Sequence, residues 1–157
     1  MLRNAMLLAL AWVLVLGSAP AVASVLEEEM LKDAGDLYVY VDDQVKDGCL
    51  PSPDTLRTKA ELILRSAGIQ IISEFSGGSY LRLFALGGSR GSLQCAGLLD
   101  VSLFQPVQTR YGPKFVETYW GAVVTTSPPA EFQRDKLQAL DQFVSDLANE
   151  ILKARQQ

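Results

Sequence analysis

The sequence predicts an α+β fold, a two-layer sandwich in which two main helices cover one face of a five-stranded mixed sheet. Apolar residues alternate with polar ones through the middle of the chain, which is the period of half-buried strands. Two other segments carry apolar residues at helical spacing on one side only. The element order is therefore β-α-β-β-β-β-α, and residues 24–157 suffice for a single domain with one core.

Residues 1–23 predict a cleaved secretory signal peptide. Arg3 precedes an apolar run over Ala5–Leu16, and Ala21-Val22-Ala23 has the small-x-small pattern of a cleavage site. The run is too short for a bilayer core of roughly 30 Å. An uncleaved anchor is the alternative, but acidic residues follow where a basic cluster would be expected. We expect cleavage before Ser24 and a periplasmic or secreted domain with no integral membrane segment.

The first half of the domain predicts a strand followed by a helix. After a short helix or turn within Val25–Asp36, Leu37–Val41 is rich in aromatic and β-branched residues and predicts a buried strand. Turn residues follow, and Ser52 or Asp54 is expected to cap a helix that ends at Gly68. The apolar stripe of this helix consists of Leu56, Ala60, Ile63, Leu64 and Ala67.

The second half predicts four strands and a final helix. The segments Ile69–Phe75 and Tyr80–Leu86 are joined by Ser-Gly-Gly-Ser, which favours a hairpin. A loop over Gly87–Ser92 leads to a strand from Gln94 to Thr109, in which Pro106 indicates an edge or a bulge. The last strand spans Lys114–Thr125. We expect a right-handed first crossover and an antiparallel meander for the later strands.

A long helix is predicted from Pro128-Pro129 to Gln157. Its apolar stripe consists of Phe132, Leu137, Leu140, Val144, Leu147, Ala148 and Ile151.

The two cysteines, Cys49 and Cys95, are expected to form a disulfide, because export leads to an oxidising compartment. A redox pair or a thiol nucleophile is the alternative. The chain has no Cys-x-x-Cys spacing and no histidine to activate a thiolate, so the structural role is favoured.

Charge and composition exclude several functions. The net charge is −4 and the basic residues are scattered, so nucleic acid is not expected as a partner. Because the chain has no histidine, Ser-His-Asp catalysis, Cys-His catalysis and His-containing metal sites are impossible within it. We expect neither an enzyme nor a cofactor.

Three weaker possibilities remain for chemistry. Asp42, Asp43 and Asp47 could crowd around a divalent cation, but their spacing is not that of an EF-hand loop, and no metal is expected. The Gly87–Ser92 segment could cradle a phosphate, but a strand follows where a helix is needed. A carboxylate-dependent hydrolase would have to draw on the strand-borne acids Glu74, Asp100 and Glu117.

One face of the sheet is the best candidate for binding. If the helices cover Leu99, Val101 and Leu103, the opposite face presents Leu98, Asp100, Ser102 and Phe104. Aromatic residues mixed with arginine are typical of an interface, although they could equally complete a core. The residues expected to bind a partner are Tyr80, Arg82, Phe84, Phe104, Tyr119 and Trp120.

Several stretches resemble small exported bacterial proteins of unassigned activity: residues 48–69, Tyr80-Leu-Arg-Leu83, Glu117-Thr-Tyr-Trp120 and the helix around Leu140–Leu147. The element order is also similar to that of the N-terminal domain of TolB, at the level of fold only. The resemblance implies an envelope setting and contacts between proteins. It transfers no catalytic residue.

The sequence thus predicts a non-catalytic exported adaptor that presents a sheet face, or an edge strand within Lys114–Thr125, to an envelope protein or to a second copy. The alternative is a module for a small ligand or lipid, in which Tyr80, Phe84, Phe104 and Trp120 line a groove. A deep apolar cavity would distinguish this alternative from a flat interface.

Overall fold

The computed structural model describes residues 29–91 and 93–157, so the predicted signal peptide and its cleavage site lie outside the described residues. One five-stranded sheet has the strand order β2-β1-β3-β4-β5. The strands are β1 (Leu37–Val45), β2 (Ile71–Ile72), β3 (Tyr80–Ser89), β4 (Cys95–Thr109) and β5 (Gly112–Ser127). The helices are α2 (Asp54–Ser66) and α3 (Pro129–Arg155), and residues 29–32 form a further helical turn.

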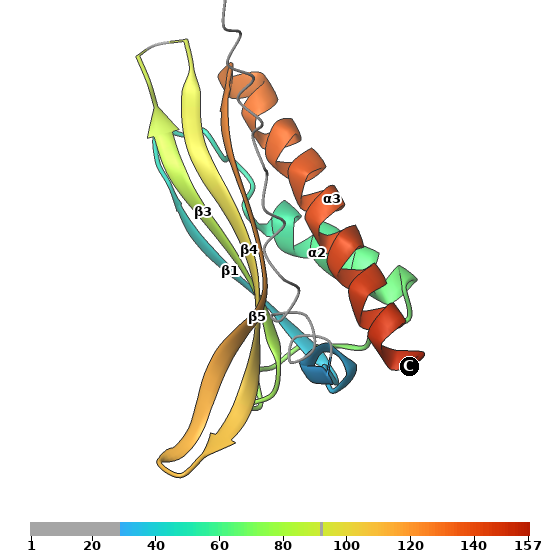
Figure 1. Ribbon diagram of the computed structural model, residues 1–157. Coiled ribbons are helices and arrows are strands. Elements are labelled where there is room, and N and C mark those ends of the chain that lie inside the picture. The colour runs from blue at the N-terminus through green and yellow to red at the C-terminus, as the bar shows by residue number, and fades with distance from the viewer. Residues whose placement is uncertain (1–28, 92) are drawn as a thin grey trace, which may run out of the picture.

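Both main helices lie on the same side of the sheet, which confirms the predicted two-layer α+β fold (Figure 1). The core lies between the layers because alternate residues of the central strands point toward the helices. On the sheet side it contains Leu37, Val39, Leu81, Leu83, Leu99, Val101 and Leu103, and on the helix side Leu56, Leu64, Leu140, Val144, Leu147 and Ile151.

The predicted hairpin between Ile69–Phe75 and Tyr80–Leu86 is wrong. β2 has only two residues and pairs in parallel with β1, at Leu37↔Ile71 and Tyr38↔Ile72. β3 pairs in parallel with the other side of β1. The segment that contains Gly77 and Gly78 therefore takes the chain from one side of β1 to the other and does not form a hairpin turn. The antiparallel meander is confirmed for β3, β4 and β5.

The predicted loop over Gly87–Ser92 is wrong in its first half, since β3 continues to Ser89. The connection to β4 is closed by a hydrogen bond from the Arg90 N–H to the Gln94 carbonyl, 2.7 Å long. Gly87 and Gly97 lie opposite each other in the β3–β4 ladder. Without side chains they allow the two strands to approach closely, so Gly87 serves strand packing where the sequence pattern indicated a loop.

Pro106 lies where the sequence indicated an edge or a bulge. The pairing of β3 with β4 ends at Tyr80↔Phe104, so Pro106 has a neighbouring strand only on its β5 side. A bulge next to it, at Leu103/Phe104, places Thr118 as an extra residue in β5. Such a residue shifts the alternation of side chains along the strand.

The helix ends match the sequence in part. α2 begins at Asp54 without a side-chain cap, so the expected capping by Ser52 or Asp54 is not found. Gly68 follows the helix with a φ of 78°, a left-handed conformation that favours glycine and agrees with the predicted end. α3 spans the predicted final helix and has proline in its first turn.

The predicted disulfide between Cys49 and Cys95 is present, with 5.8 Å between the Cα atoms. It joins the turn after β1 to the first residue of β4. Both cysteines are buried and pack with Phe132 of α3 in a small second cluster.

Lys136 is a buried charge that the apolar pattern of α3 did not reveal. Its side chain is fully buried, and Nζ donates a hydrogen bond of 2.6 Å to the Gly97 carbonyl. Nζ also lies 5.0 Å from the centre of the Phe132 ring. In the described part of the chain no carboxylate forms an ion pair with it. Burial lowers the pKa of this lysine from 10.5 to about 8.

We expect Lys136 to make stability rise with pH between about 8 and 10.5. In that window the unfolded chain keeps a proton that the folded chain has released, so raising the pH favours folding. A Lys136→Met variant lacks this contribution. Urea unfolding of both proteins should show wild type gaining about 2 kcal/mol over the variant between about pH 7.5 and pH 10.

Tyrosine ionisation affects both proteins alike and cancels in this difference. A difference in unfolding free energy that stays constant with pH would contradict the prediction.

Candidate protein-binding face

The sheet face opposite α2 and α3, here called the open face, is built from cross-strand rows of side chains. Residues directly opposite each other in adjacent strands share a face. One row runs Tyr40, Arg82, Ser102 and Trp120 across β1, β3, β4 and β5. The neighbouring rows are Tyr38, Tyr80, Phe104, Glu117; Asp42, Phe84, Asp100, Ala122; and Gln44, Leu86, Leu98, Val124.

Five of the six residues predicted to bind a partner lie together on this face: Tyr80, Arg82, Phe84, Phe104 and Trp120. Each comes from a row that the antiparallel ladders of β3, β4 and β5 hold in register.

Tyr119, the sixth predicted residue, lies on the other side of the sheet. It pairs with Leu103 of the core face, and its hydroxyl donates a hydrogen bond of 2.9 Å to the Phe143 carbonyl on α3. Burial, followed by the nearby carboxylates of Asp146 and Glu150, raises the pKa of Tyr119 above 10.0. Adjacent strand residues point in opposite directions, so Tyr119 and Trp120 do not share a face.

Aromatic rings gather at one end of the open face. The rings of Tyr80 and Phe104 are stacked with centroids 5.0 Å apart. Phe75, from the loop after β2, and Phe115, from β5, meet Tyr80 edge-on at 5.5 and 5.3 Å. Tyr38 contacts Phe75 at 5.8 Å. Such tilted and offset arrangements are favourable for aromatic rings.

These rings border an apolar depression of about 420 Å³ lined by Tyr38, Tyr40, Phe75, Tyr80 and Phe115. Of the four residues expected to line a ligand groove, only Tyr80 contributes to it. Its volume is within the range of small-molecule sites, and it is also large enough for the apolar side chain of a protein partner.

Four residues of this depression were not predicted, for different reasons. Tyr38 and Tyr40 alternate with the core residues Leu37 and Val39, so the period of β1 carried a signal for them. Phe115 is brought to the open face by a strand whose alternation is shifted by the bulge. Phe75 lies in a loop, where no periodicity indicates a direction.

Beside the aromatic cluster, Asp100 organises a polar network. Only 8% of Asp100 is exposed, and its carboxylate accepts hydrogen bonds from Arg82, Ser102 and the indole N–H of Trp120. The guanidinium of Arg82 also lies 5.1 Å from the Phe104 ring centre and 5.9 Å from that of Phe84. Arg82 and Trp120 are thereby held in fixed positions on the face.

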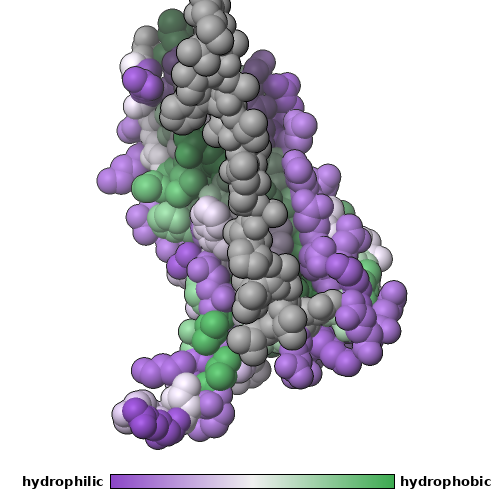
Figure 2. Space-filling model, viewed as in Figure 1, coloured by the Kyte–Doolittle hydropathy of each residue, from purple (hydrophilic) through white to green (hydrophobic). Residues whose placement is uncertain are grey.

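Large apolar side chains remain exposed on the open face. Tyr40 is 44% exposed, Trp120 64% and Val124 74%. By contrast, hydrophilic side chains dominate the outer side of α3 and the tip of the β4–β5 hairpin (Figure 2). No described helix or strand packs over the open face (Figure 1).

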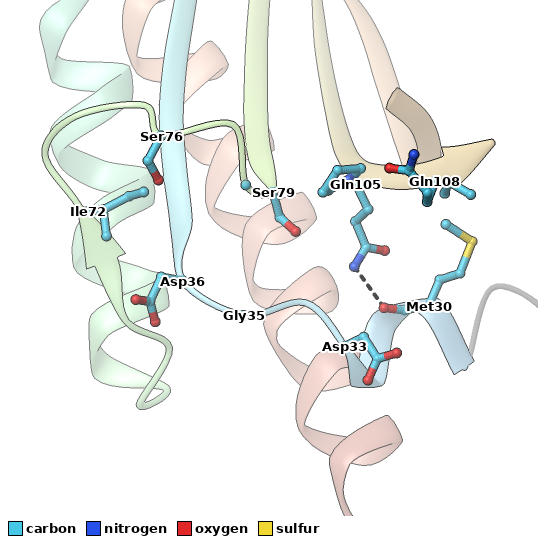
Figure 3. A pocket seen from close by; sticks show the side chains of 12 residues that line it. Met30, Asp33, Gly35, Asp36, Ile72, Ser76, Ser79, Gln105 and Gln108 are labelled. Carbon is cyan, nitrogen blue, oxygen red and sulfur yellow. Dashed lines mark hydrogen bonds between the residues drawn. The ribbon is translucent and has the colours of Figure 1, made fainter. Parts of the chain in front are cut away.

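A second depression, of about 580 Å³, lies at the same end of the sheet, between the segment around Met30, the loop before β3 and the second half of β4. Figure 3 shows Asp33, Asp36 and Gln108 around it, and Gln105 donating a hydrogen bond of 2.7 Å to the Met30 carbonyl. This bond ties the N-terminal helical turn to β4.

The acidic residues considered for chemistry are engaged elsewhere or exposed. Asp43 accepts a hydrogen bond from the Val45 N–H, and Asp47 accepts one from the Ser89 N–H. Glu74 is exposed in the loop after β2, and Glu117 is exposed on β5. In residues 29–91 and 93–157 no three cysteine or acidic side chains gather in a way that could hold a metal ion.

None of the helices in the described ranges is both long enough and apolar enough to cross a membrane.

No model of a protein family matches the chain, and no curated protein matches it either. Among solved structures, a PelC L103M dodecamer from Paraburkholderia phytofirmans is similar with a TM-score of 0.43 and 13% identity, covering 73% of this chain and 87% of that one. A minor lipoprotein from Acinetobacter baumannii has a TM-score of 0.30 and 20% identity, with 77% and 91% covered.

Both TM-scores are too low to establish a shared fold. The resemblance to the TolB domain stays a prediction.

Proposed function

We propose that this chain is a non-catalytic exported binding domain that presents its open face to another protein of the cell envelope. The observation that carries the proposal is the set of exposed apolar side chains on one side of the sheet, with Tyr40, Trp120 and Val124 all more than two-fifths exposed. Large exposed apolar patches on a soluble domain mark interaction sites. Export is supported by the leader pattern and by the disulfide.

The chemistry of the open face favours a protein as the occupant. Aromatic residues and arginine are enriched where proteins bind one another, and Arg82 and Trp120 are fixed in place by Asp100. A held side chain loses little conformational entropy on binding. The depression beside them is apolar and would receive an apolar anchor residue of the partner.

A non-enzymatic role is part of the proposal. The chain has no histidine to act as a base, and Asp100, the most buried acid of the open face, already accepts three hydrogen bonds.

Photo-crosslinking from defined positions tests the proposed surface. A photoreactive phenylalanine analogue at Tyr40, in the chain exported by living cells, should give one discrete adduct with a different protein. The same analogue at Leu62, which is 62% exposed on α2, is the matched control and should give none. Phe75→Ser combined with Phe115→Ser removes two walls of the depression and should abolish the Tyr40 adduct.

Equal adduct yields from Tyr40 and Leu62, or no heteromeric adduct from Tyr40, would refute the proposal. Circular dichroism of the double variant checks that loss of the adduct is not loss of the fold.

A small apolar ligand is the second candidate, favoured by the volume and apolar lining of the same depression. Solvent extraction of chain purified without detergent, followed by mass spectrometry, should then recover a stoichiometric compound. The Phe75→Ser/Phe115→Ser variant should lose it.

A further inference from the structure

The outer edge of β5 is long, and its second part, which begins at the bulge residue Thr118, lacks the usual protection, whereas the first part contains Pro113, Lys114 and Glu117. β5 pairs with β4 along its whole length, from Cys95↔Ser127 to Thr109↔Gly112, and no described strand lies on its other side. In an edge strand, about half of the backbone N–H and C=O groups point away from the neighbouring strand. These groups form a template for another strand.

The sequence of β5 leaves this template open. From Thr118 to Ser127 it reads Thr-Tyr-Trp-Gly-Ala-Val-Val-Thr-Thr-Ser, with no charged residue and no proline. Natural proteins block edges with lysine, proline, bulges or very short strands. The opposite edge of this sheet follows that rule, because β2 has two residues and β1 carries Asp42 and Asp43.

We propose that β5 pairs antiparallel with β5 of a second copy, about a two-fold axis at Ala122. Because residues 118–127 carry no charge, pairing this segment with the same segment of a second copy places no like charges opposite each other. In this register Trp120 lies opposite Val124 of the second copy, and the same pair occurs again across the axis. These are the two most exposed large apolar side chains on the open face within this stretch, at 64% and 74%.

Two features select this register: which residues of β5 share a face, and how well the facing side chains pack. Trp120, Ala122 and Val124 share the open face, because they pair with Ser102, Asp100 and Leu98 of β4. An axis perpendicular to the sheet keeps the open faces of both copies on one side, as a continuous sheet requires. Moving the axis to Val123 would place Trp120 opposite Thr126, which offers less apolar surface. Aromatic side chains opposite β-branched ones are favourable cross-strand pairs.

The dimer does not depend on the proposed function, because its backbone pairing uses the edge of β5, although its Trp120–Val124 pairs lie on the open face. It would join two open faces into one ten-stranded surface. Tyr40 of each copy lies on β1, three strands from β5, and is therefore roughly 17 Å from the axis at about 4.8 Å per strand. A heteromeric adduct from Tyr40 and a homodimer through β5 are therefore separate results.

Cysteine crosslinking tests the register. In the processed, exported chain, Ala122→Cys should form a disulfide-linked dimer under mild oxidation, since residues facing each other across an antiparallel pair have Cα atoms about 4.5–5.5 Å apart. Val124→Cys is the matched control, because the two copies of residue 124 are separated by four strand positions, roughly 14 Å. It should remain monomeric on a denaturing gel.

Sedimentation equilibrium tests association without a new thiol. The wild-type chain and Leu62→Lys should dimerise with the same dissociation constant. Ala122→Lys, which places two like charges opposite each other at the axis, should lose the dimer. Equal crosslinking of the two cysteine variants, a monomeric wild type at every concentration, or a mixed disulfide of Ala122→Cys with a different protein would each overturn the proposal.

Discussion

Replacing both Cys49 and Cys95 by alanine is expected to lower the free energy of unfolding by about 4 kcal/mol. The disulfide spans 46 residues of sequence, and closing a loop of that length restricts the unfolded chain by this amount in the chain-entropy treatment. The link joins the turn after β1 to the start of β4, so reduction frees the segment that contains α2, β2 and β3. Urea unfolding monitored by tryptophan fluorescence measures the difference.

A reducing agent supplies the control for this prediction. It should lower the unfolding midpoint of wild type toward that of the double variant and leave the double variant unchanged. Equal midpoints for oxidised and reduced wild type would show that the disulfide contributes nothing to stability.

Replacing Gly97 by alanine is expected to lower the free energy of unfolding by about 3 kcal/mol. A Cβ atom at this position would lie 2.4 Å from the Leu86 carbonyl oxygen and 3.0 Å from the Gly87 Cα. Both are backbone atoms, so no side-chain rotation relieves the contact. The Phe132 ring, 3.1 Å from the same point, closes the third side. The β3–β4 ladder must then separate locally.

Gly78→Ala is the matched control, because a Cβ there has no neighbour within 4 Å. Its unfolding free energy should lie within about 0.5–1 kcal/mol of wild type, the ordinary range for a permissive glycine. A Gly97→Ala protein as stable as the Gly78→Ala protein would show that the two strands can move apart at little cost.

The two layers of the fold were predictable because the spacing of apolar residues shows which side of each element is buried. The apolar stripe of α3 and the alternation around Leu99–Leu103 each indicate one buried side. In a single domain these two apolar sides pack against each other. The partner of a short strand was not predictable. The apolar character of Ile71–Ile72 fits pairing with β1 and pairing with β3 equally well. Which strand β2 pairs with depends on the position of the C-terminal end of α2 relative to the sheet.

The binding face was predictable where alternation is regular and failed where it is interrupted. Tyr80, Arg82 and Phe84 alternate with core residues along one strand, and the structure places all three on the open face. Tyr119 was assigned to the wrong side because an adjacent pair, Tyr119-Trp120, was treated as one feature. Phe75 reaches the aromatic cluster from a loop, through contacts that exist only after the chain has folded.

The sequence by itself determined the class of the fold, the cysteine pair, the absence of histidine chemistry and the expectation of export. These properties depend on amino-acid composition and on the local spacing of apolar residues, and both are already present in the unfolded chain. Only the tertiary structure decided that β1 lies between β2 and β3, that Lys136 is buried against Gly97, and that Asp100 holds Arg82 and Trp120. The side-chain contacts join residues 18 or more positions apart in the sequence. Strand order and register bring these residues together, and local sequence does not encode either of them.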